Sequence, residues 1–175
     1  MKISDRIKVV QGDITELDVD CIVTAANSAL LGGGGVDGAV HRAAGAELVK
    51  ASSQLAPCPA GQARITPGFN LAAKFVIHAV GPIFSELNRD SQVLAATYES
   101  ALLLANEHKV VRIAFPCIST GVYGFPKPEA CEVAIATVID WMRQHADRKI
   151  VIFCCFDDED VSLYRHRLLE LGAID

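Results

Sequence analysis

The chain has 175 residues, of which 51% are hydrophobic, and a mean hydropathy of +0.29; this excludes a disordered tail or a low-complexity scaffold. Its net charge of −5 argues against general nucleic-acid binding, because phosphate backbones require a basic face. With no leader-like apolar segment at the start and no stretch of ~18 apolar residues, we expect one soluble cytoplasmic domain over residues 1–175, without a membrane partner.

Short β-branched segments alternate with helical stretches along the chain. Strands are predicted at residues 6–10, 21–24, 63–66, 75–80, 110–115 and 150–156. Helices are predicted over about 36–51, 91–107, 128–145 and 157–169, with Pro128 as a first helical residue. The strands at 110–115 and 150–156 are apolar throughout, as in a sheet covered on both faces. This order predicts an α/β fold, a three-layer α/β/α sandwich around a mixed, mostly parallel sheet.

The six cysteines show no zinc-binding spacing, since none forms Cys-x-x-Cys and no histidine lies at a suitable distance from a pair. Most of them lie in apolar strand-like segments, where a reduced thiol behaves as a small hydrophobic group. No serine occupies a Gly-x-Ser-x-Gly turn, and no Cys/His pair is placed as nucleophile and base. We therefore expect neither a metal, nor a cofactor, nor a covalent intermediate.

Ligands of such sheets bind in the loops that follow the carboxyl ends of the strands. The first of these loops contains Asp13, whose carboxylate can accept a hydrogen bond from an exocyclic amine such as that of adenine. The segment at 13–16 also fits a helix start with Asp13 as its cap. The residues alone favour the cap over the ligand contact.

The second loop carries four consecutive glycines at 32–35, directly before a predicted helix. Such a run costs backbone entropy, and exposed N–H groups at a helix N-terminus suit an anion or a sugar. A flexible surface loop is the alternative. Asp37 is either a functional carboxylate or an ordinary charge in the first helical turn. The run is not a dinucleotide fingerprint or a P-loop, because the acidic or Lys residues of those motifs are missing.

Two further loops follow the last two strands. The segment at 116–126 is rich in small and hydroxyl side chains and is a second candidate phosphate site, although a plain loop explains it equally well. Phe156 can stack on a nucleobase or pack in the core. His41, four residues after Asp37, can pair with it on one helix face, and His78 is expected to be a buried strand histidine.

In their order, these motifs resemble the macrodomains, the α/β/α modules that bind ADP-ribose. Within that family the chain is similar to the MacroD-type and bacterial O-acetyl-ADP-ribose deacetylase branch. The matching stretches are residues 10–15, 25–28, GGGGVDGAVHR at 32–42 and PCISTGVYGFP at 116–126. The resemblance extends from about Ile7 to the C-terminal helix, and the glycine run followed by Val-Asp-Gly is its most discriminating part.

The resemblance implies a role for each matching residue. Asp13 and the Ile14 N–H would bind adenine, and Phe156 would pack on its ring. Asn27 would bind a hydroxyl of the distal ribose, and Asp37 would face that ribose and the scissile ester. Two groups of residues would enclose the pyrophosphate: Gly33, Gly34, Gly35 and Val36, and Ser119, Thr120, Gly121, Val122 and Tyr123. Related hydrolases often carry Tyr at the position of Phe125, which would pack against the distal ribose without the hydroxyl.

The resemblance also implies ester hydrolysis by a bound water, without a metal. The water would attack the acyl carbon of O-acetyl-ADP-ribose, or the link between ribose and an acidic side chain of a protein. Asp37 would act as general base or orient that water. The implied partners are ADP-ribose, O-acetyl-ADP-ribose and mono-ADP-ribosylated proteins. Two rival functions are a module that binds ADP-ribose without cleaving it and a nucleotide-dependent oxidoreductase, which would need a dinucleotide fingerprint.

Overall fold

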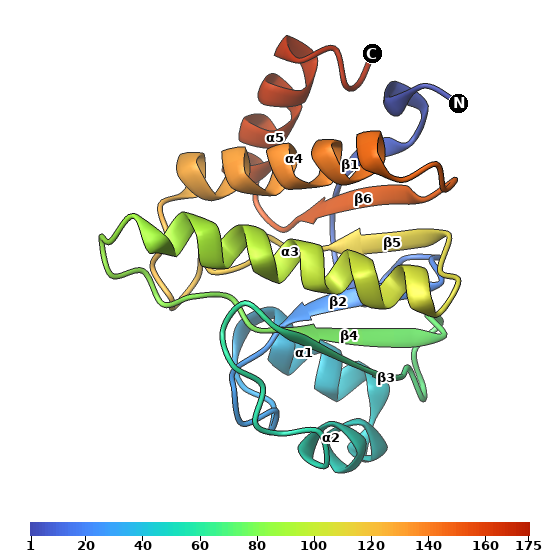
Figure 1. Ribbon diagram of the computed structural model, residues 1–175. Helices are drawn as coiled ribbons and strands as arrows, with labels where there is room; N and C mark the ends of the chain where they lie inside the picture. The colour runs from blue at the N-terminus through green and yellow to red at the C-terminus, as the bar shows by residue number, and fades with distance from the viewer.

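The computed structural model describes all 175 residues (Figure 1). Six strands form one sheet in the order β1-β6-β5-β2-β4-β3. Neighbouring strands are parallel except β3 and β4, which are antiparallel. The mixed, mostly parallel sheet predicted from the sequence is therefore confirmed. The strands are β1 (Ile7–Gln11), β2 (Cys21–Ala25), β3 (Ala63–Pro67), β4 (Phe75–Ala79), β5 (Arg112–Phe115) and β6 (Ile150–Cys155).

Helices cover both faces of this sheet, which gives the expected three layers. Figure 1 shows α3 and α4 running across one face. The helices are α1 (Gly35–Ala44), α2 (Ala46–Ser53), α3 (Arg89–Glu107), α4 (Lys127–Gln144) and α5 (Asp158–Glu170), with short 3-10 helices η1 (Ile3–Asp5) and η2 (Ile14–Glu16). None of the helices combines the length and the apolar character that crossing a membrane requires.

The apolar strands serve two separate cores. In β2, Val23 packs in the larger core with residues of α3, α4 and α5, whereas Ile22 packs in a second core with Val40 of α1 and Leu48 of α2. Successive side chains of a strand point to opposite faces, so a strand between two helical layers must be apolar at every position. This explains the uninterrupted apolar segments seen in the sequence.

The single helix expected over residues 36–51 is wrong, because the chain divides it at Gly45. Gly45 has a φ of +90°, a backbone conformation that glycine adopts without the steric cost of a side chain. Its N–H donates to the carbonyl of His41 and closes α1, and α2 begins at the next residue. Two short helices therefore cover the region expected for one.

Three smaller boundaries also differ from the expectation. The strand expected from residue 110 begins at Arg112, because the N–H of Val110 donates to Ala105 at the end of α3. Pro128 is the second residue of α4, after Lys127, and Pro126 precedes the helix. The last strand ends at Cys155, which leaves Phe156 beyond the sheet.

Candidate functional site

A cavity of about 700 Å³ lies where the loops after β1, β2, β4, β5 and β6 meet. The parallel arrangement brings the carboxyl ends of these strands to one edge of the sheet, where ligands of doubly wound folds bind. Every site residue predicted from the sequence lines this cavity except Phe125. The two glycine-bearing segments, residues 33–36 and 119–123, are far apart in the sequence but line the same cavity.

Phe125 was expected to line the cavity, but it does not. Its side chain is buried in the larger core, and its ring centroid lies 5.1 Å from that of Phe84. Its N–H donates to the carbonyl of Ser119 at 2.9 Å. Phe125 therefore anchors the loop at 116–126 to the larger core. Burial of the aromatic ring stabilises the fold more than its exposure at the rim of the cavity would.

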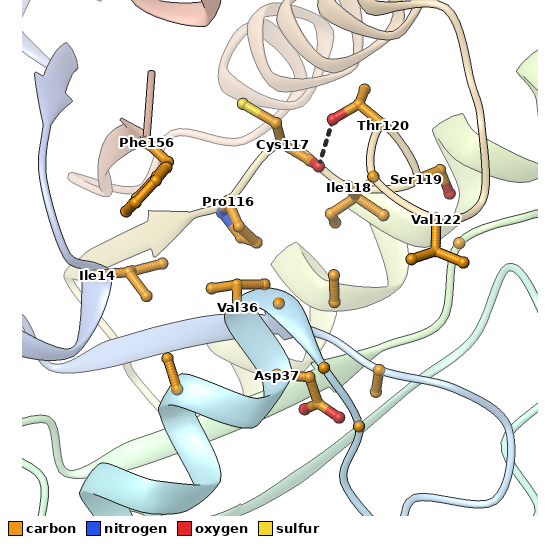
Figure 2. A pocket seen from close by; sticks show the side chains of 18 of the residues that line it. Ile14, Val36, Asp37, Pro116, Cys117, Ile118, Ser119, Thr120, Val122 and Phe156 are labelled. Atoms are coloured by element: carbon orange, nitrogen blue, oxygen red, sulfur yellow. Dashed lines mark hydrogen bonds between the residues drawn. The ribbon is translucent and has the colours of Figure 1, made fainter.

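The first wall segment, residues 119–123, presents backbone N–H groups that have no acceptor within the protein. Ser119 has a φ of +67°, and the hydroxyl of Thr120 donates to the carbonyl of Cys117 at 3.0 Å, as the dashed line in Figure 2 shows. The buried Ser119 hydroxyl also lacks a partner. Consecutive free N–H groups form a concave site for an anion, and the Ser119 hydroxyl is a further polar group beside them without a partner.

The second wall segment, residues 33–36, is the N-terminus of α1 and also has N–H groups without acceptors. No side chain caps this helix, so its positive dipole end is open to the cavity. Asn27 holds the segment: its Nδ2 donates to the carbonyl of Gly32 at 3.2 Å, and its Oδ1 accepts from the N–H of Leu30 at 3.2 Å. These two hydrogen bonds anchor the turn, which argues against the alternative of a flexible surface loop.

The charges around the cavity do not favour anions by themselves. Asp13, Asp37 and Asp160 line it, with Arg42 as the one cationic residue. An anionic ligand must therefore be held by backbone N–H groups rather than by net charge. The carboxylates are available for the hydroxyl or amine groups of the same ligand.

Asp37 is almost completely buried, with 4% of its surface exposed. Its Oδ1 accepts a hydrogen bond from the Thr24 hydroxyl at 2.9 Å, and the Nε2 of His41 lies 3.5 Å away. Burial raises the pKa of Asp37, while the Thr24 hydrogen bond and His41 act in the opposite direction. A carboxylate with a raised pKa is a better proton acceptor near neutral pH. The expected pairing with His41 is confirmed.

Asp13 and Phe156 lie at the other end of the cavity. Asp13 caps η2, since its Oδ1 accepts from the N–H of Thr15 at 2.9 Å and from the Thr15 hydroxyl at 2.6 Å. These bonds lower the pKa of Asp13, and its other oxygen has no partner. Phe156 is 85% exposed, so packing in the core is excluded, and Figure 2 shows it across from Ile14.

Several lining residues were not predicted as site residues from the sequence, among them Gly81, Arg42, Cys117 and Asp160. Gly81 follows β4, and a Cβ there would collide with the side chains of Ser119 and Ile118. The loop at 116–126 can therefore close against β4 only because this residue is glycine. The signal available in the sequence was the Gly-Pro pair after a strand at this edge of the sheet.

Comparison of the sequence with known proteins identifies one family. A sequence model described as "Macro domain" matches residues 23–134. Macro domain-containing protein RSc0334 of Ralstonia nicotianae is 54% identical over 166 residues, which cover 94% of this chain and 95% of that protein. O-acetyl-ADP-ribose deacetylase of Escherichia fergusonii is 51% identical over 173 residues, covering 95% and 97%. ADP-ribose glycohydrolase MACROD1 of Mus musculus is 49% identical over 170 residues, with coverage of 95% of this chain but 53% of the mouse protein.

Solved structures show the same fold with nucleotides bound. The macrodomain of Oceanobacillus iheyensis with ADP superimposes with a TM-score of 0.93 at 41% identity, covering 98% of this chain and 95% of that one. The macrodomain of Trypanosoma brucei in complex with ADP-ribose gives a TM-score of 0.89 at 36% identity, covering 93% and 69%.

Proposed function

Because this chain belongs to the macro domain family, we propose that it hydrolyses ester bonds of ADP-ribose derivatives. The substrates are O-acetyl-ADP-ribose, which gives ADP-ribose and acetate, and mono-ADP-ribose attached to acidic side chains of proteins. Two relatives that are about half identical to this chain over the aligned residues are named O-acetyl-ADP-ribose deacetylase and ADP-ribose glycohydrolase. The observation that carries the proposal is the pair of N–H runs without acceptors, at 33–36 and 119–123, which line one cavity with the buried Asp37.

The ligand occupies the cavity from end to end in this proposal. Its adenine lies between Ile14 and Phe156, with its amine donating to the free oxygen of Asp13. The two N–H runs hold the pyrophosphate, since such groups bind phosphate without a cationic side chain. The distal ribose then reaches Asn27, whose amide keeps one unused hydrogen and one unused lone pair for a ribose hydroxyl.

A water molecule is the nucleophile in this mechanism. It lies between the pyrophosphate and the distal ribose and attacks the acyl carbon, while Asp37 accepts its proton. The acyl–oxygen bond then breaks, and the ribose oxygen leaves as a hydroxyl by taking up the proton that Asp37 accepted, which regenerates the carboxylate. The hydroxyl and thiol groups of Ser119, Thr120 and Cys117 have no base as a hydrogen-bond partner, which supports water over a covalent intermediate. The backbone N–H groups stabilise the charge, so the reaction is expected to need no metal.

We also infer that residues 1–175 form one macro domain located in the cytoplasm. The matched region spans 23–134, yet β1 and β6, which lie outside it, pair with each other in the same sheet. All six cysteines are free, and the sulfur atoms of Cys117 and Cys155 lie only 4.0 Å apart. Free thiols at this distance support a reducing compartment.

Release of acetate from O-acetyl-ADP-ribose tests the proposal. We expect turnover by the wild-type protein that EDTA does not reduce, and a loss of at least ~10²-fold in Asp37→Ala, because a positioned acid–base group contributes 10²–10⁴-fold. Asn27→Ala is expected to reduce turnover as well. Calorimetry should show that Asp37→Ala still binds ADP-ribose, and Asp140→Ala, an exposed position on α4, should behave as wild type.

Two outcomes would contradict parts of this proposal. A wild-type protein that binds ADP-ribose but releases no acetate is a binding module and not an enzyme. Undiminished turnover in Asp37→Ala would remove Asp37 from the mechanism while leaving the reaction in place.

A further inference from the structure

A cluster of three potential metal ligands lies behind the wall of the cavity. Asp37 and His41 occupy consecutive turns of α1, and His78 comes from the middle of β4. One ligand atom from each residue lies within 4.8 Å of the other two. The rings of His41 and His78 have centroids 6.1 Å apart. The sequence spacing predicts the pairing of Asp37 with His41 but not the third member, because His78 reaches them only through the pairing of β4 with β2.

His78 has a ring nitrogen for which the protein offers no partner. Its Nε2 pairs with the Thr66 hydroxyl at 2.9 Å, while its Nδ1 is buried without any hydrogen bond. His78 is 1% exposed, and leaving such a group unpaired costs about 1–3 kcal/mol. A neutral imidazole binds metals through a ring nitrogen, and the Nδ1 of His78 is the ring nitrogen that has no partner.

We propose that Asp37, His41 and His78 bind one divalent metal ion of the zinc class, and that this ion inhibits the enzyme by occupying the Asp37 carboxylate. Two imidazoles and one carboxylate are a known ligand set for zinc, with water at the fourth position. Metal binding stands on the geometry alone. Its inhibitory effect rests on the proposed hydrolysis.

The distances suit a tetrahedral ion. Zinc–nitrogen bonds of 2.0–2.1 Å place neighbouring ligand atoms roughly 3.3 Å apart, and Asp37 Oδ1 and His41 Nε2 are 3.5 Å apart. The remaining separations are at most 4.8 Å, so binding of one ion requires these ligand atoms to approach each other by up to about 1.5 Å. The Thr66 hydroxyl, by accepting from Nε2–H, would leave the Nδ1 lone pair free for the ion, which is how outer hydrogen bonds orient metal-binding histidines.

An entry path leads to this cluster from outside the ligand cavity. A separate hollow of about 430 Å³ is lined by His41, Gly32 and Gly38, and it shares Gly33 and Arg42 with the cavity. An ion can therefore reach His41 from the outer side of the glycine segment. The N–H runs stay free, so ADP-ribose binding is retained while the carboxylate loses its function as a base.

Titration of the EDTA-stripped full chain with zinc, against a chromophoric chelator, tests the site. We expect one ion per chain in wild type, and loss of this ion in both His41→Gln and His78→Gln. Thr66→Val should weaken zinc binding by ~10–100-fold, the usual effect of removing an outer hydrogen bond. His108→Gln, an exposed histidine on another helix boundary, should bind as wild type.

Binding of the zinc ion by cysteine thiolates is the competing explanation for its uptake, since zinc also binds cysteine. Cys117→Ser should therefore retain the ion, and the cobalt form should lack the charge-transfer absorption of thiolate ligands. The proposal is overturned if wild type takes up no ion at one equivalent, or if Cys117→Ser loses the ion while the histidine variants keep it. Should His78→Gln fail to fold, His41→Gln and Thr66→Val decide the matter in the same way.

Acetate release then tests the inhibition. One equivalent of zinc should reduce turnover at least tenfold, EDTA should restore it, and calorimetry should show ADP-ribose affinity within about twofold. A protein that binds zinc at this cluster with unchanged or faster turnover refutes the inhibition but keeps the site. A protein that binds zinc but is inactive even with EDTA refutes the proposed hydrolysis instead.

Discussion

The two carboxylate oxygens of Asp13 have different environments. Oδ1 accepts both hydrogen bonds from Thr15 and caps η2, whereas Oδ2 has no partner, and Asp13 lines the cavity. The sequence presented the cap and the ligand contact as alternatives. The structure allows both, because a carboxylate has separate acceptors for each.

This division predicts that Asp13→Asn weakens ADP-ribose binding without disturbing η2. The amide oxygen can still cap Thr15, but its NH₂ group then meets the adenine amine donor to donor. Calorimetry should show a loss of about 1.5–3 kcal/mol, the usual contribution of a hydrogen bond to a charged group.

An analogue with hypoxanthine in place of adenine is the matched control, since it has no exocyclic amine to donate. The wild-type protein should prefer ADP-ribose over this analogue, and Asp13→Asn should lose the preference. Equal affinities of wild type and Asp13→Asn for ADP-ribose would disprove the adenine contact.

Helix α1 and the segment before it act as one element. A Cβ at Gly38 would lie 2.5 Å from the carbonyl oxygen of Gly33, which is closer than real Cβ contacts. Gly38 therefore allows the glycine segment to fold back onto the first turn of α1, and this contact directs the N–H groups of residues 33–36 into the cavity.

We predict that Gly38→Ala displaces the segment and weakens ADP-ribose binding by about tenfold, which corresponds to ~1.4 kcal/mol. Overpacking of this kind also lowers the free energy of unfolding by ~1–3 kcal/mol. Ala43→Ser, at an exposed position of the same helix, controls for changes in α1 itself. Unchanged binding in Gly38→Ala would show that the segment is free to adjust.

At the scale of the whole molecule, Lys127 connects the beginnings of α4 and α5. Its Nζ lies 3.0 Å from Asp157 and 3.2 Å from Glu159, and Asp157 caps α5 by accepting from the N–H of Asp160 at 2.9 Å. The two loops before these helices carry the N–H run at 119–123 and Phe156. This contact therefore ties two parts of the cavity wall to each other.

Stability towards acid should depend on such carboxylates. The Asp160 N–H and Lys127 lower the pKa of Asp157, and the N–H of Ser85 lowers that of Asp90. Because their folded-state pKa values lie below the unfolded value of 3.8, the stability they add is present above that pH. It is lost as the pH falls towards the folded-state values.

We predict that the urea midpoint falls in two stages. It falls first below about pH 6.5, because buried His78 has a folded-state pKa of about 4 and the unfolded chain binds this proton first. It falls again below about pH 4, as the carboxylates of Asp157 and Asp90 are protonated. Asp157→Ser keeps a capping oxygen but no charge, so its fall should be smaller than that of wild type, whereas Asp157→Ala should also lose ~0.5–2 kcal/mol at neutral pH. Asp140→Ser serves as the exposed control. A fall in Asp157→Ser as steep as in wild type would exclude Asp157 as a contributor.

By itself, the sequence determined the layered fold and most of the site. Strand and helix periodicity, the glycine run and the loop at 116–126 are local patterns, and the parallel order brings the loops to one edge. The division at Gly45 was missed because a glycine within a helical pattern does not reveal its φ. The burial of Phe125 was missed because an aromatic residue in a loop fits a ligand contact and a core contact equally well.

Only the tertiary structure decided which groups meet across distant elements. The pairing of β2 with β4 brings His78 beside α1, and the glycine at position 81 lets the loop at 116–126 close against β4. Such contacts depend on the packing of side chains from separate segments, and a linear pattern carries no distance between them. The sequence thus predicted most of the residues that line the cavity, and the packing fixed which of them lie within reach of one another.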